Sequence, residues 1–254
     1  MTGDFSKQVV VITGASSGIG AVFAEEVGRR GGSVVLVARR ADRLAEVAAR
    51  VGSAAEVVAA DVTRREDVQR VLQAALARFG RVDVWVNNAG RGITRGFEQL
   101  TDEDVDAMMR DNLKSALYGM QTVLPHFKER KQGVLVNVSS MLSRAPYATV
   151  RSAYSASKAA LNSLTETLRF ELARDYPGIS VQLVLPGPVA TDFGTNALGG
   201  GMDSRILPGV QSAEEVARVM AEGILARRPD IYTRPEGLEQ VLGYLRGLAG
   251  VKAG

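Results

Sequence analysis

The chain has 254 residues, 46% of them hydrophobic, which is enough for one large α/β domain or two small ones. Its 31 Lys and Arg residues exceed its 28 Asp and Glu residues by only three, and the two signs are interspersed, which argues against a nucleic-acid-binding surface. It contains no cysteine, which excludes disulfide bonds and thiolate chemistry.

Residues 1–8 show neither the cationic start nor the apolar run of a signal peptide. No uninterrupted apolar stretch further along the chain is long enough to span a membrane. We therefore expect a cytoplasmic protein that binds neither nucleic acid nor membranes.

The first predicted element is a strand of four branched residues, Val9–Ile12, which is apolar enough to be buried on both faces of a parallel sheet. A glycine-rich turn and a helix predicted from Ile19 to Arg30 follow. In such a unit Gly14 permits the sharp turn, Gly18 lets the backbone approach a pyrophosphate, and Gly20 lets the helix lie close to the strand. The helix N-terminus then directs unpaired N–H groups at the phosphates, which predicts a dinucleotide site.

Other interpretations of this turn have to be weighed. Its spacing, Gly-x3-Gly-x-Gly, differs from the Gly-x-Gly-x-x-Gly of the commonest dinucleotide fold, and a glycine-rich connection without a ligand would have the same pattern. Residues 14–18 also match the Gly-x-Ser-x-Gly elbow of serine hydrolases, but the only histidine is His126, and no later histidine completes a triad. A Walker loop is excluded because no Gly-Lys-Ser/Thr follows.

The second predicted strand, Ser33–Ala38, bears on the choice of cofactor. In this kind of fold an acidic residue at the end of the second strand binds the ribose 2′-hydroxyl, whereas an arginine accommodates a 2′-phosphate. Ala38 stands at the acidic position and Arg39 follows it, so we predict NADP(H) in preference to NAD(H), because a guanidinium binds phosphate through paired hydrogen bonds. Alternatively, Arg39 and Arg40 only solvate the start of the next helix.

A helix over Arg43–Arg50 and a third strand over Ala55–Ala60 are predicted next. Asp61 follows that strand and faces the crevice in which ligands bind, where its carboxylate can accept a hydrogen bond from the adenine amino group. The same carboxylate can cap the helix predicted over Arg64–Phe79, and the two roles are compatible.

The fourth predicted strand begins at Val82 and ends in four polar or small residues, Asn87, Asn88, Ala89 and Gly90. The asparagine side chains can satisfy the loop backbone, and the two small residues leave room for a cofactor ribose. A long helix then starts with a cap at Thr101 and continues through Leu124, with Asn112 inside its apolar run. An asparagine inside a helix is costly unless its amide is used, so Asn112 either points to the surface or has a function.

The fifth predicted strand, Val134–Val138, is followed by Ser139 and Ser140 at the crevice end, and the next helix carries Tyr154 and Lys158 on one face. A phenol with an ordinary pKa of about 10 is a poor proton donor or acceptor at neutral pH, but a neighbouring ammonium lowers that pKa toward the working range. A serine hydroxyl can hold a carbonyl oxygen while Tyr154 donates its proton. A tyrosine and a lysine on a helix usually form an amphipathic surface, but the glycine turn favours catalysis here.

Three helices are predicted in the rest of the chain, at Ser152–Tyr176, Ala213–Ala226 and around Leu238–Leu248, and the last of them is amphipathic. Two strands are predicted at Val181–Leu185 and Asp230–Thr233, and an irregular segment at Asp192–Gly209. The irregular segment has no hydrophobic period, which predicts a mobile lid over the substrate. The last helix is expected to pack against the core or a second subunit rather than a membrane.

Two groups of residues near the predicted crevice bear on the substrate. The expected border of an apolar pocket is formed by Met141, Leu142, Pro146, Tyr147, Ile93 and Phe193. Four arginines near the same loops form a hypothetical site for an anionic substrate, namely Arg91, Arg95, Arg144 and Arg151.

These motifs resemble, in this order, the short-chain dehydrogenase/reductase family in its compact single-domain form. The resemblance is carried by residues 13–20 (Thr-Gly-Ala-Ser-Ser-Gly-Ile-Gly), 87–90 (Asn-Asn-Ala-Gly), Asn112, Ser140, Tyr154 to Lys158, and 186–191 (Pro-Gly-Pro-Val-Ala-Thr), and it covers nearly the whole chain. It implies a Rossmann-like, doubly wound α/β fold with a mostly parallel, seven-stranded sheet and helices on both faces. It also implies one domain over residues 1–254, with 192–209 as the lid, and a homo-dimer or homo-tetramer.

The resemblance further implies the role of each residue. Tyr154 would be the general acid in reduction and the base in oxidation, Lys158 would lower its pKa and bind the nicotinamide ribose, and Ser140 would orient the substrate carbonyl. Asn112 would hold a water that links Lys158 to solvent. The cofactor would be bound by Gly14, Ser16, Ser17, Gly18, Ile19, Gly20, Arg39, Arg40, Asp61, Val62, Asn88, Ala89, Gly90, Tyr154, Lys158, Pro186, Gly187, Val189 and Thr191. No metal is implied.

Ser140 lies one residue farther from Tyr154 than in many relatives, so Ser139 and Ser143 are alternatives for its role. The predicted reaction is hydride transfer between NADP(H) and a small carbonyl or alcohol substrate. Alternatives are the same chemistry on ketoacyl thioesters or steroid-like ketones, and a cofactor-sensing interaction protein without turnover.

Overall fold

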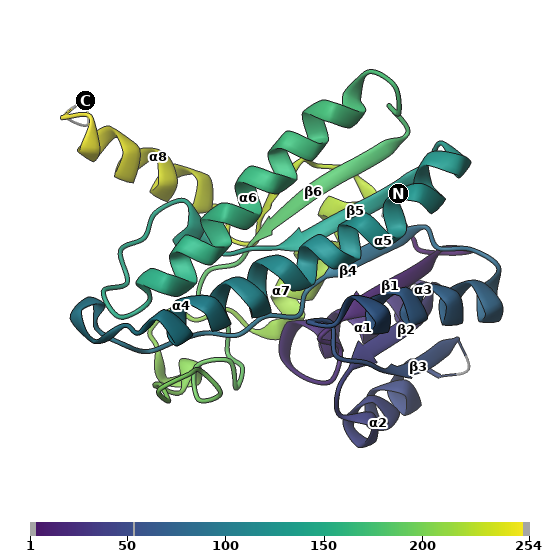
Figure 1. The fold of residues 1–254 in the computed structure, drawn as a ribbon, viewed down its shortest axis with the longest axis horizontal. Coiled ribbons are helices and arrows are strands. Elements are labelled where there is room, and N and C mark those ends of the chain that lie inside the picture. The colour runs from purple at the N-terminus through teal and green to yellow at the C-terminus, as the bar shows by residue number, and fades with distance from the viewer. Residues whose placement is uncertain (1–3, 53, 251–254) are drawn as a thin grey trace.

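The computed structural model describes residues 4–52 and 54–250, and its seven strands form one parallel sheet (Figure 1). The strands are β1 Val9–Thr13, β2 Ser33–Ala38, β3 Ala55–Ala59, β4 Val84–Asn87, β5 Gly133–Val138, β6 Ile179–Leu185 and β7 Asp230–Tyr232. Their order in the sheet is β3-β2-β1-β4-β5-β6-β7, and every neighbouring pair is parallel. The predicted Rossmann-like fold is therefore confirmed.

The order of the strands determines where a ligand can bind. The chain moves outward from β1 to β3, crosses back to the other side of β1 at β4, and then continues outward to β7. The connections after β1 and β4 leave the sheet in opposite directions, which opens a crevice at the carboxyl ends of these two strands.

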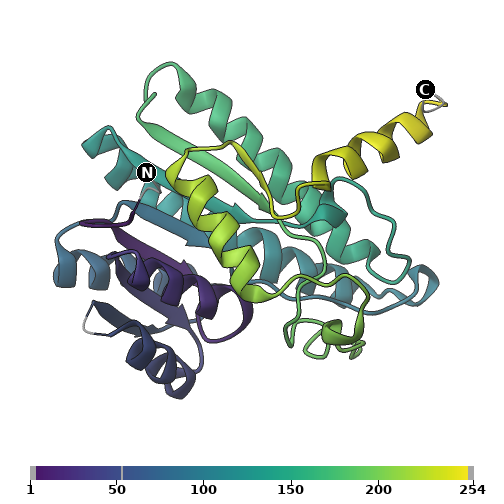
Figure 2. The ribbon, with the colours of Figure 1, turned by 180° about the vertical axis from the view of Figure 1, so that it is seen from behind.

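Helices cover both faces of the sheet (Figures 1 and 2). They are α1 Gly18–Arg29, α2 Ala41–Val51, α3 Arg65–Phe79, α4 Asp102–Met109, α5 Ser115–Arg130, α6 Ser152–Ala173, α7 Ala213–Leu225 and α8 Gly237–Leu248. Side chains of α1, α2 and α7 pack on one face of the sheet, and side chains of α3, α5 and α6 pack on the other. The predicted ends of these elements agree with the observed ones to within one helical turn, except that the helix predicted through Leu124 continues to Arg130.

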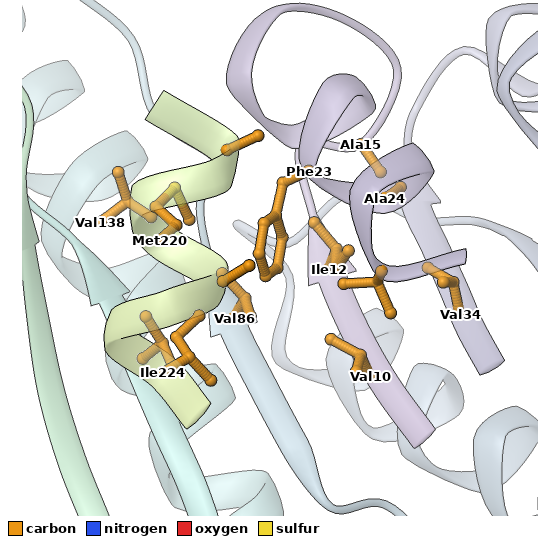
Figure 3. Close-up of a cluster of buried hydrophobic side chains, with 14 of the residues drawn as sticks. Val10, Ile12, Ala15, Phe23, Ala24, Val34, Val86, Val138, Met220 and Ile224 are labelled. Atoms are coloured by element: carbon orange, nitrogen blue, oxygen red, sulfur yellow. The ribbon is translucent and has the colours of Figure 1, made fainter. Parts of the chain in front are cut away.

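Strand β1 is buried on both faces because it lies in the middle of this arrangement. Val10 and Ile12 belong to the cluster beneath α1 and α7, whereas Val9 and Val11 belong to the cluster on the opposite face. Figure 3 shows the first cluster, in which Phe23 of α1 lies between the sheet and the side chains of α7. The alternation explains why the first strand needs an uninterrupted apolar sequence.

The long helix predicted from Thr101 is interrupted. It begins as expected, with a capping box in which the Thr101 hydroxyl accepts from the Asp104 N–H and the Asp104 carboxylate accepts from the Thr101 N–H. Between α4 and α5, however, residues Arg110–Lys114 form a π-helical turn that contains Asn112. Such turns insert one extra residue into a helix and are frequent at functional sites.

The last helix, expected to pack against the core or a second subunit, contacts the core only through its first turns. Helix α8 extends away from the rest of the molecule (Figures 1 and 2), and only Gly237 and Val241 along it are buried. Leu245 and Leu248 are 49% and 70% exposed. None of the described helices combines the length and hydrophobicity needed to cross a bilayer.

Candidate active site

A cleft of about 940 Å³ lies at the carboxyl ends of the strands and is lined by residues from the loops that follow β1 to β6. It brings together nearly all residues that the sequence analysis assigns to the site. The exceptions are Gly20 and Asn112, which do not line the cleft. Both lie behind its wall, as their contacts show.

Two glycines shape the first turn. Gly14 and Gly18 have φ angles of +68° and +56°, in the left-handed region that residues other than glycine rarely adopt. A Cβ added to Gly20 would lie 2.5 Å from the Gly14 carbonyl oxygen, so only glycine lets α1 start this close to the turn. The turn thus leaves the N-terminus of α1 open toward the cleft, where its N–H groups can bind phosphate.

Thr13 ties this turn to the loop after β4, which the sequence analysis did not foresee. Its hydroxyl accepts from the N–H groups of Asn88 (3.0 Å) and Ala89 (3.1 Å), and the Asn88 amide donates to the Thr13 carbonyl (2.9 Å). The position of Thr13, a polar residue at the end of a buried strand, could have indicated such a contact. Through these bonds Asn88 connects the turn after β1 with the loop after β4. Ala89 and Gly90 line the cleft.

At the end of the cleft beside the first turn, two arginines follow β2. Arg40 reaches back over the first turn and donates to the hydroxyls of Ser16 (3.0 Å) and Ser17 (3.2 Å). Arg39 also lines the cleft, and its side chain has no hydrogen bond or ion pair with any described residue. Arg40 therefore does more than solvate the start of a helix, which was the alternative for both arginines, because it binds the first turn.

Asp61 lines the same end, but it does not cap the following helix as the sequence analysis allowed. Its carboxylate accepts from the N–H (3.0 Å) and the hydroxyl (2.8 Å) of Thr63, which forms a local turn. Helix α3 begins later, after Arg64, without a side-chain cap. Its neighbour Val62 lines the cleft as well.

Asn112 supports the cleft from behind. The π-turn directs its side chain inward, where it is 1% exposed, so the surface-pointing alternative is wrong. Its amide exchanges two hydrogen bonds with the backbone of Arg91, at 2.8 Å and 2.9 Å, and donates to Ser157 at 3.2 Å. A Cβ on Gly90 would lie 2.8 Å from the Asn112 oxygen and 3.3 Å from Lys158 Nζ, which explains the glycine there.

Ser140 follows β5 and is held in an extended conformation, with its hydroxyl oxygen accepting from the Leu142 N–H (3.2 Å). The two alternative serines are engaged elsewhere. Ser139 donates to the Asn162 amide oxygen (2.6 Å), and the Asn162 amide donates to the Ser143 hydroxyl (2.8 Å). Ser143 in turn donates to the Ser140 carbonyl oxygen. Of these three serines, Ser140 is the one whose hydroxyl is hydrogen-bonded to the Tyr154 phenol.

Asn162 is a second residue that the sequence analysis missed. It lies one helical turn after Lys158 and two turns after Tyr154 on α6, so it shares their face of the helix. That spacing was the signal that could have found it.

Tyr154 and Lys158 project from α6 into the wall of the cleft, where they are 7% and 3% exposed. The Tyr154 ring meets the Phe193 ring edge to face, with 5.6 Å between centroids. Lys158 Nζ donates to the Val138 carbonyl oxygen (2.8 Å) and lies 5.9 Å from the centroid of the Tyr154 ring.

Burial dominates the protonation of both groups. It raises the pKa of Tyr154 to about 12, against the opposing effects of hydrogen bonding from Ser140 and the charge of Arg151. It lowers the pKa of Lys158 to about 8, although the Val138 carbonyl favours the charged amine. The sequence analysis expects a neighbouring ammonium to lower the phenol's pKa, but here Lys158 is directed at the Val138 carbonyl and the loss of hydration of the phenol outweighs other effects.

The loop after β6 closes the cleft beside Ser140. The Pro186 carbonyl accepts from the Met141 N–H (2.9 Å), which fixes this loop beside the one that carries Ser140. Thr191 approaches the first turn, since a Cβ on Gly18 would lie 3.4 Å from its side chain. Gly187 and Val189 line the cleft between them.

The predicted apolar pocket is correct in part. Met141, Leu142, Tyr147 and Phe193 line the cleft, whereas Pro146 does not. Ile93 is fully buried in a cluster with Met108, Ala153 and Tyr154, so it supports the wall from behind.

Comparisons with known proteins agree with this geometry. The sequence profile of the family described as short chain dehydrogenase matches residues 8–198. An uncharacterized oxidoreductase of Staphylococcus epidermidis is 37% identical over 194 residues, which cover 74% of this chain and 83% of the relative.

Two solved structures are also similar. A short chain dehydrogenase/reductase of Burkholderia phymatum in complex with NAD has a TM-score of 0.88 and 26% identity, covering 98% of this chain and 97% of its own. A short-chain dehydrogenase of Sphingobium yanoikuyae in complex with NADPH has a TM-score of 0.81 and 33% identity, covering 97% of this chain and 96% of its own. A nicotinamide dinucleotide is thus the common ligand, with the 2′-phosphate in one case and without it in the other.

Proposed function

The chain belongs to the short-chain dehydrogenase/reductase family, and on that premise we propose that it is an NADP(H)-dependent enzyme that interconverts a carbonyl compound and an alcohol with Tyr154 as general acid or base. Membership of the family makes it an NAD(P)-dependent oxidoreductase of CH–OH and C=O groups. The observation that carries the Tyr154 assignment is the convergence of Ser140, Tyr154 and Lys158 on one wall of the cleft.

The protonation states fit reduction at neutral pH. When bound, the nicotinamide supplies a hydride to the carbonyl carbon, and the carbonyl oxygen then requires a proton. A phenol with a pKa of about 12 is protonated at pH 7, so Tyr154 holds that proton. The Ser140 hydroxyl, which is hydrogen-bonded to the Tyr154 phenol in the ligand-free protein, can donate to the same oxygen when a substrate is bound. The phenolate that remains is favoured by the hydrogen bond from Ser140 and the charge of Arg151. We assign the same role to Lys158, which is charged below a pKa of about 8 and lies 5.9 Å from the centroid of the ring.

The catalytic assignment is tested with Tyr154→Phe, which keeps the ring and its packing on Phe193 but removes the acidic hydrogen. We expect NADPH oxidation with a panel of carbonyl compounds to fall by at least about 100-fold, in the range that general acid–base catalysis supplies. The Kd for NADPH, measured by calorimetry, should stay within about threefold. Equal activity of wild type and variant would refute the role of Tyr154.

A comparison of three serine variants tests the choice among the serines. Because Ser139 and Ser143 are already bonded to Asn162, Ser140→Ala should lose more activity than Ser139→Ala or Ser143→Ala. The opposite order would transfer the substrate-orienting role to one of the other serines. Ketoacyl thioesters and steroid-like ketones belong in the substrate panel, because the same site would serve them.

The preference for NADP(H) is supported by the nucleotide end of the cleft. Ala38 provides no carboxylate for a ribose 2′-hydroxyl, Arg39 is without a partner among the described residues, and Arg40 already spans the turn. Two guanidinium groups at this point can bind a 2′-phosphate through charge-assisted hydrogen bonds.

Arg39→Ala should therefore raise the Kd for NADPH by roughly 10-fold to 100-fold, the size of a lost hydrogen bond to a charged group, and leave the Kd for NADH nearly unchanged. Arg43→Ala is the matched control, because Arg43 lies on the next helix, pairs with Glu46 and does not line the cleft. An equal loss of affinity for both nucleotides would count against the phosphate contact.

Three further proposals concern the extent of the catalytic unit, its location and its assembly. We propose that residues 1–254 form one catalytic unit with 192–209 as its lid, that the protein acts in the cytoplasm, and that it assembles as a homo-dimer or homo-tetramer. The exposed apolar side chains on α6 support the last of these.

A further inference from the structure

The four arginines that the sequence suggests as an anion site are not equivalent in the structure. Arg95 pairs with Asp104 at 2.7 Å, and Arg144 pairs with Glu166 and with Asp230. These two side chains stabilise the fold and are not available to a ligand. Arg91 and Arg151 form no ion pair and no side-chain hydrogen bond with the described residues.

Arg151 has the more informative position. It precedes α6 by one residue and Tyr154 by three, and its side chain is partly buried in the wall of the cleft. A Cβ built on Gly92 would lie 2.6 Å from Arg151 Nη1 and 3.0 Å from the Phe193 ring, so the guanidinium and that ring meet beside Gly92. Phe193 in turn packs on Tyr154. The cation therefore lies where the loop after β4, which holds Gly92, meets the loop after β6, which holds Phe193.

A partly buried guanidinium without an acceptor is costly, and the surrounding charges do not offset it. Burial lowers the pKa of Arg151, which records the unfavourable desolvation of its charge. The carboxylates that line this end of the cleft are already engaged, because Asp111 pairs with Arg110 (2.9 Å) and Asp192 pairs with Arg205 (3.1 Å). Arg91 stands at the exposed rim with the same sign. This end of the cleft thus offers positive charge and no free carboxylate.

We propose that Arg151 binds a carboxylate of the substrate, so that the enzyme acts on oxo acids and their hydroxy-acid products. This inference rests on the proposed oxidoreductase function and specifies its substrate class. The reacting carbonyl lies at Ser140 and Tyr154, the carboxylate lies at Arg151, and the carbon skeleton between them packs on Leu142, Tyr147 and Phe193. A fork of N–H donors suits a carboxylate because two parallel hydrogen bonds can form.

The test compares each acid with its neutral methyl ester, using 4-formylbenzoate and 4-oxopentanoate with NADPH. Wild type should have a kcat/KM at least about tenfold higher for one or both acids than for the esters. Arg151→Gln keeps a polar side chain of similar length but removes the charge. It should reduce kcat/KM for the acid by about 30-fold, mainly through KM, and reduce that of the ester far less.

Arg91→Gln is the matched control, since it removes one positive charge from the rim of the same cleft. It should change both kcat/KM values slightly and to the same extent, as a general electrostatic attraction would. Three outcomes would overturn the proposal: no preference for either acid in wild type, equal losses for acid and ester in Arg151→Gln, or the same acid-specific loss in Arg91→Gln. The second outcome would assign Arg151 to the tuning of Tyr154 instead.

Binding without turnover separates this inference from the proposed function. By calorimetry, 4-(hydroxymethyl)benzoate should bind the wild-type protein with NADP present at least about tenfold more tightly than it binds Arg151→Gln. If the ester is reduced, kcat/KM is no higher for the acid, and the hydroxy acid does not bind, then the proposed carboxylate site is wrong and the proposed oxidoreductase function stands. If the acid binds in a manner that depends on Arg151 but no compound is reduced, the proposed reaction is wrong and the site remains.

Discussion

Lys158 is a titratable group that is almost fully buried in the wall of the cleft. Its folded-state pKa of about 8 lies below its ordinary value of 10.5, so between these pH values the unfolded chain binds more protons than the native protein. Stability from this group therefore rises with pH across that window and is lowest below pH 8, where the buried amine is ionised. Tyr154 acts in the opposite direction above its ordinary value of 10.0, because burial favours its protonated form.

We predict that Lys158→Met stabilises the ligand-free protein at pH 7 by roughly 1 to 3 kcal/mol, because methionine fills the site without a charge. The gain should shrink as the pH rises from 8 toward 10, where the native lysine is neutral. Urea unfolding followed by circular dichroism at pH 7 and pH 10, on wild type and variant, measures this difference. A gain that is independent of pH, or a loss at pH 7, would contradict the prediction.

At this scale the sequence predicted which side chains meet but not what their surroundings do to them. Tyr154 and Lys158 are four residues apart on one helix, so their common face follows from helical geometry alone. The pKa of Tyr154 depends instead on its burial, to which Phe193, 39 positions later, contributes by packing against its ring. No local pattern contains that contact.

The junction between β5 and α6 positions Ser140 through Asn162. The Asn162 amide bridges Ser139 and Ser143, on either side of Ser140, and Ser139 also donates to the Lys158 carbonyl (3.3 Å). These bonds hold the loop after β5 against the helix that carries Tyr154. Asn162 is thus a positioning residue, since it does not itself line the cleft.

We predict that Asn162→Ala lowers kcat for carbonyl reduction by about tenfold, leaves the Kd for NADPH unchanged, and lowers stability by about 1 to 2 kcal/mol. Thr165→Val is the matched control, because Thr165 accepts a buried hydrogen bond from Asn137 one turn further along α6, away from Ser140. The control should lose similar stability without the loss in kcat. Equal kcat values for the two variants would show that Asn162 has only a structural role.

Strands and helices differ in how far the sequence could predict them. Runs of branched residues between glycine-rich or polar turns located most of the strands, because strands buried on both faces need such runs, whereas β7, Asp-Ile-Tyr, has no such run. The π-turn at Arg110–Lys114 escaped prediction, since the apolar pattern continues through α4 and α5 and one inserted residue changes it little. The turn is nevertheless what directs Asn112 inward to Arg91.

At the scale of the whole molecule, the cleft joins both halves of the sheet, and the sequence predicted it from the order of strands and helices. The place of α8 could not be predicted in the same way. An amphipathic pattern indicates that one face of a helix is shielded from water, but it does not indicate which surface of the protein or of a partner covers that face. In the structure Val241 contacts the core beside Met141 and Leu183, and the rest of the helix extends outward.

The exposed face of α6 leads to a prediction about assembly. Phe170 is 80% exposed and Leu164 is 39% exposed on this helix, and large apolar side chains in such positions mark contact surfaces between proteins. If the proposed homo-oligomer forms through α6, Phe170→Asp should shift the mass measured by light scattering from that of two or four chains toward that of one, because an interface cannot bury an unpaired carboxylate.

A second aromatic substitution separates this effect from a general loss of surface hydrophobicity. Phe97 is 76% exposed but lies in the short 3₁₀ turn Phe97–Gln99, before α4. Phe97→Asp therefore removes a ring of the same size and exposure while leaving α6 intact, and it should leave the mass unchanged. A wild-type protein that is monomeric at 50 to 100 times the concentration used for assays, or equal dissociation in both variants, would remove α6 as the subunit contact.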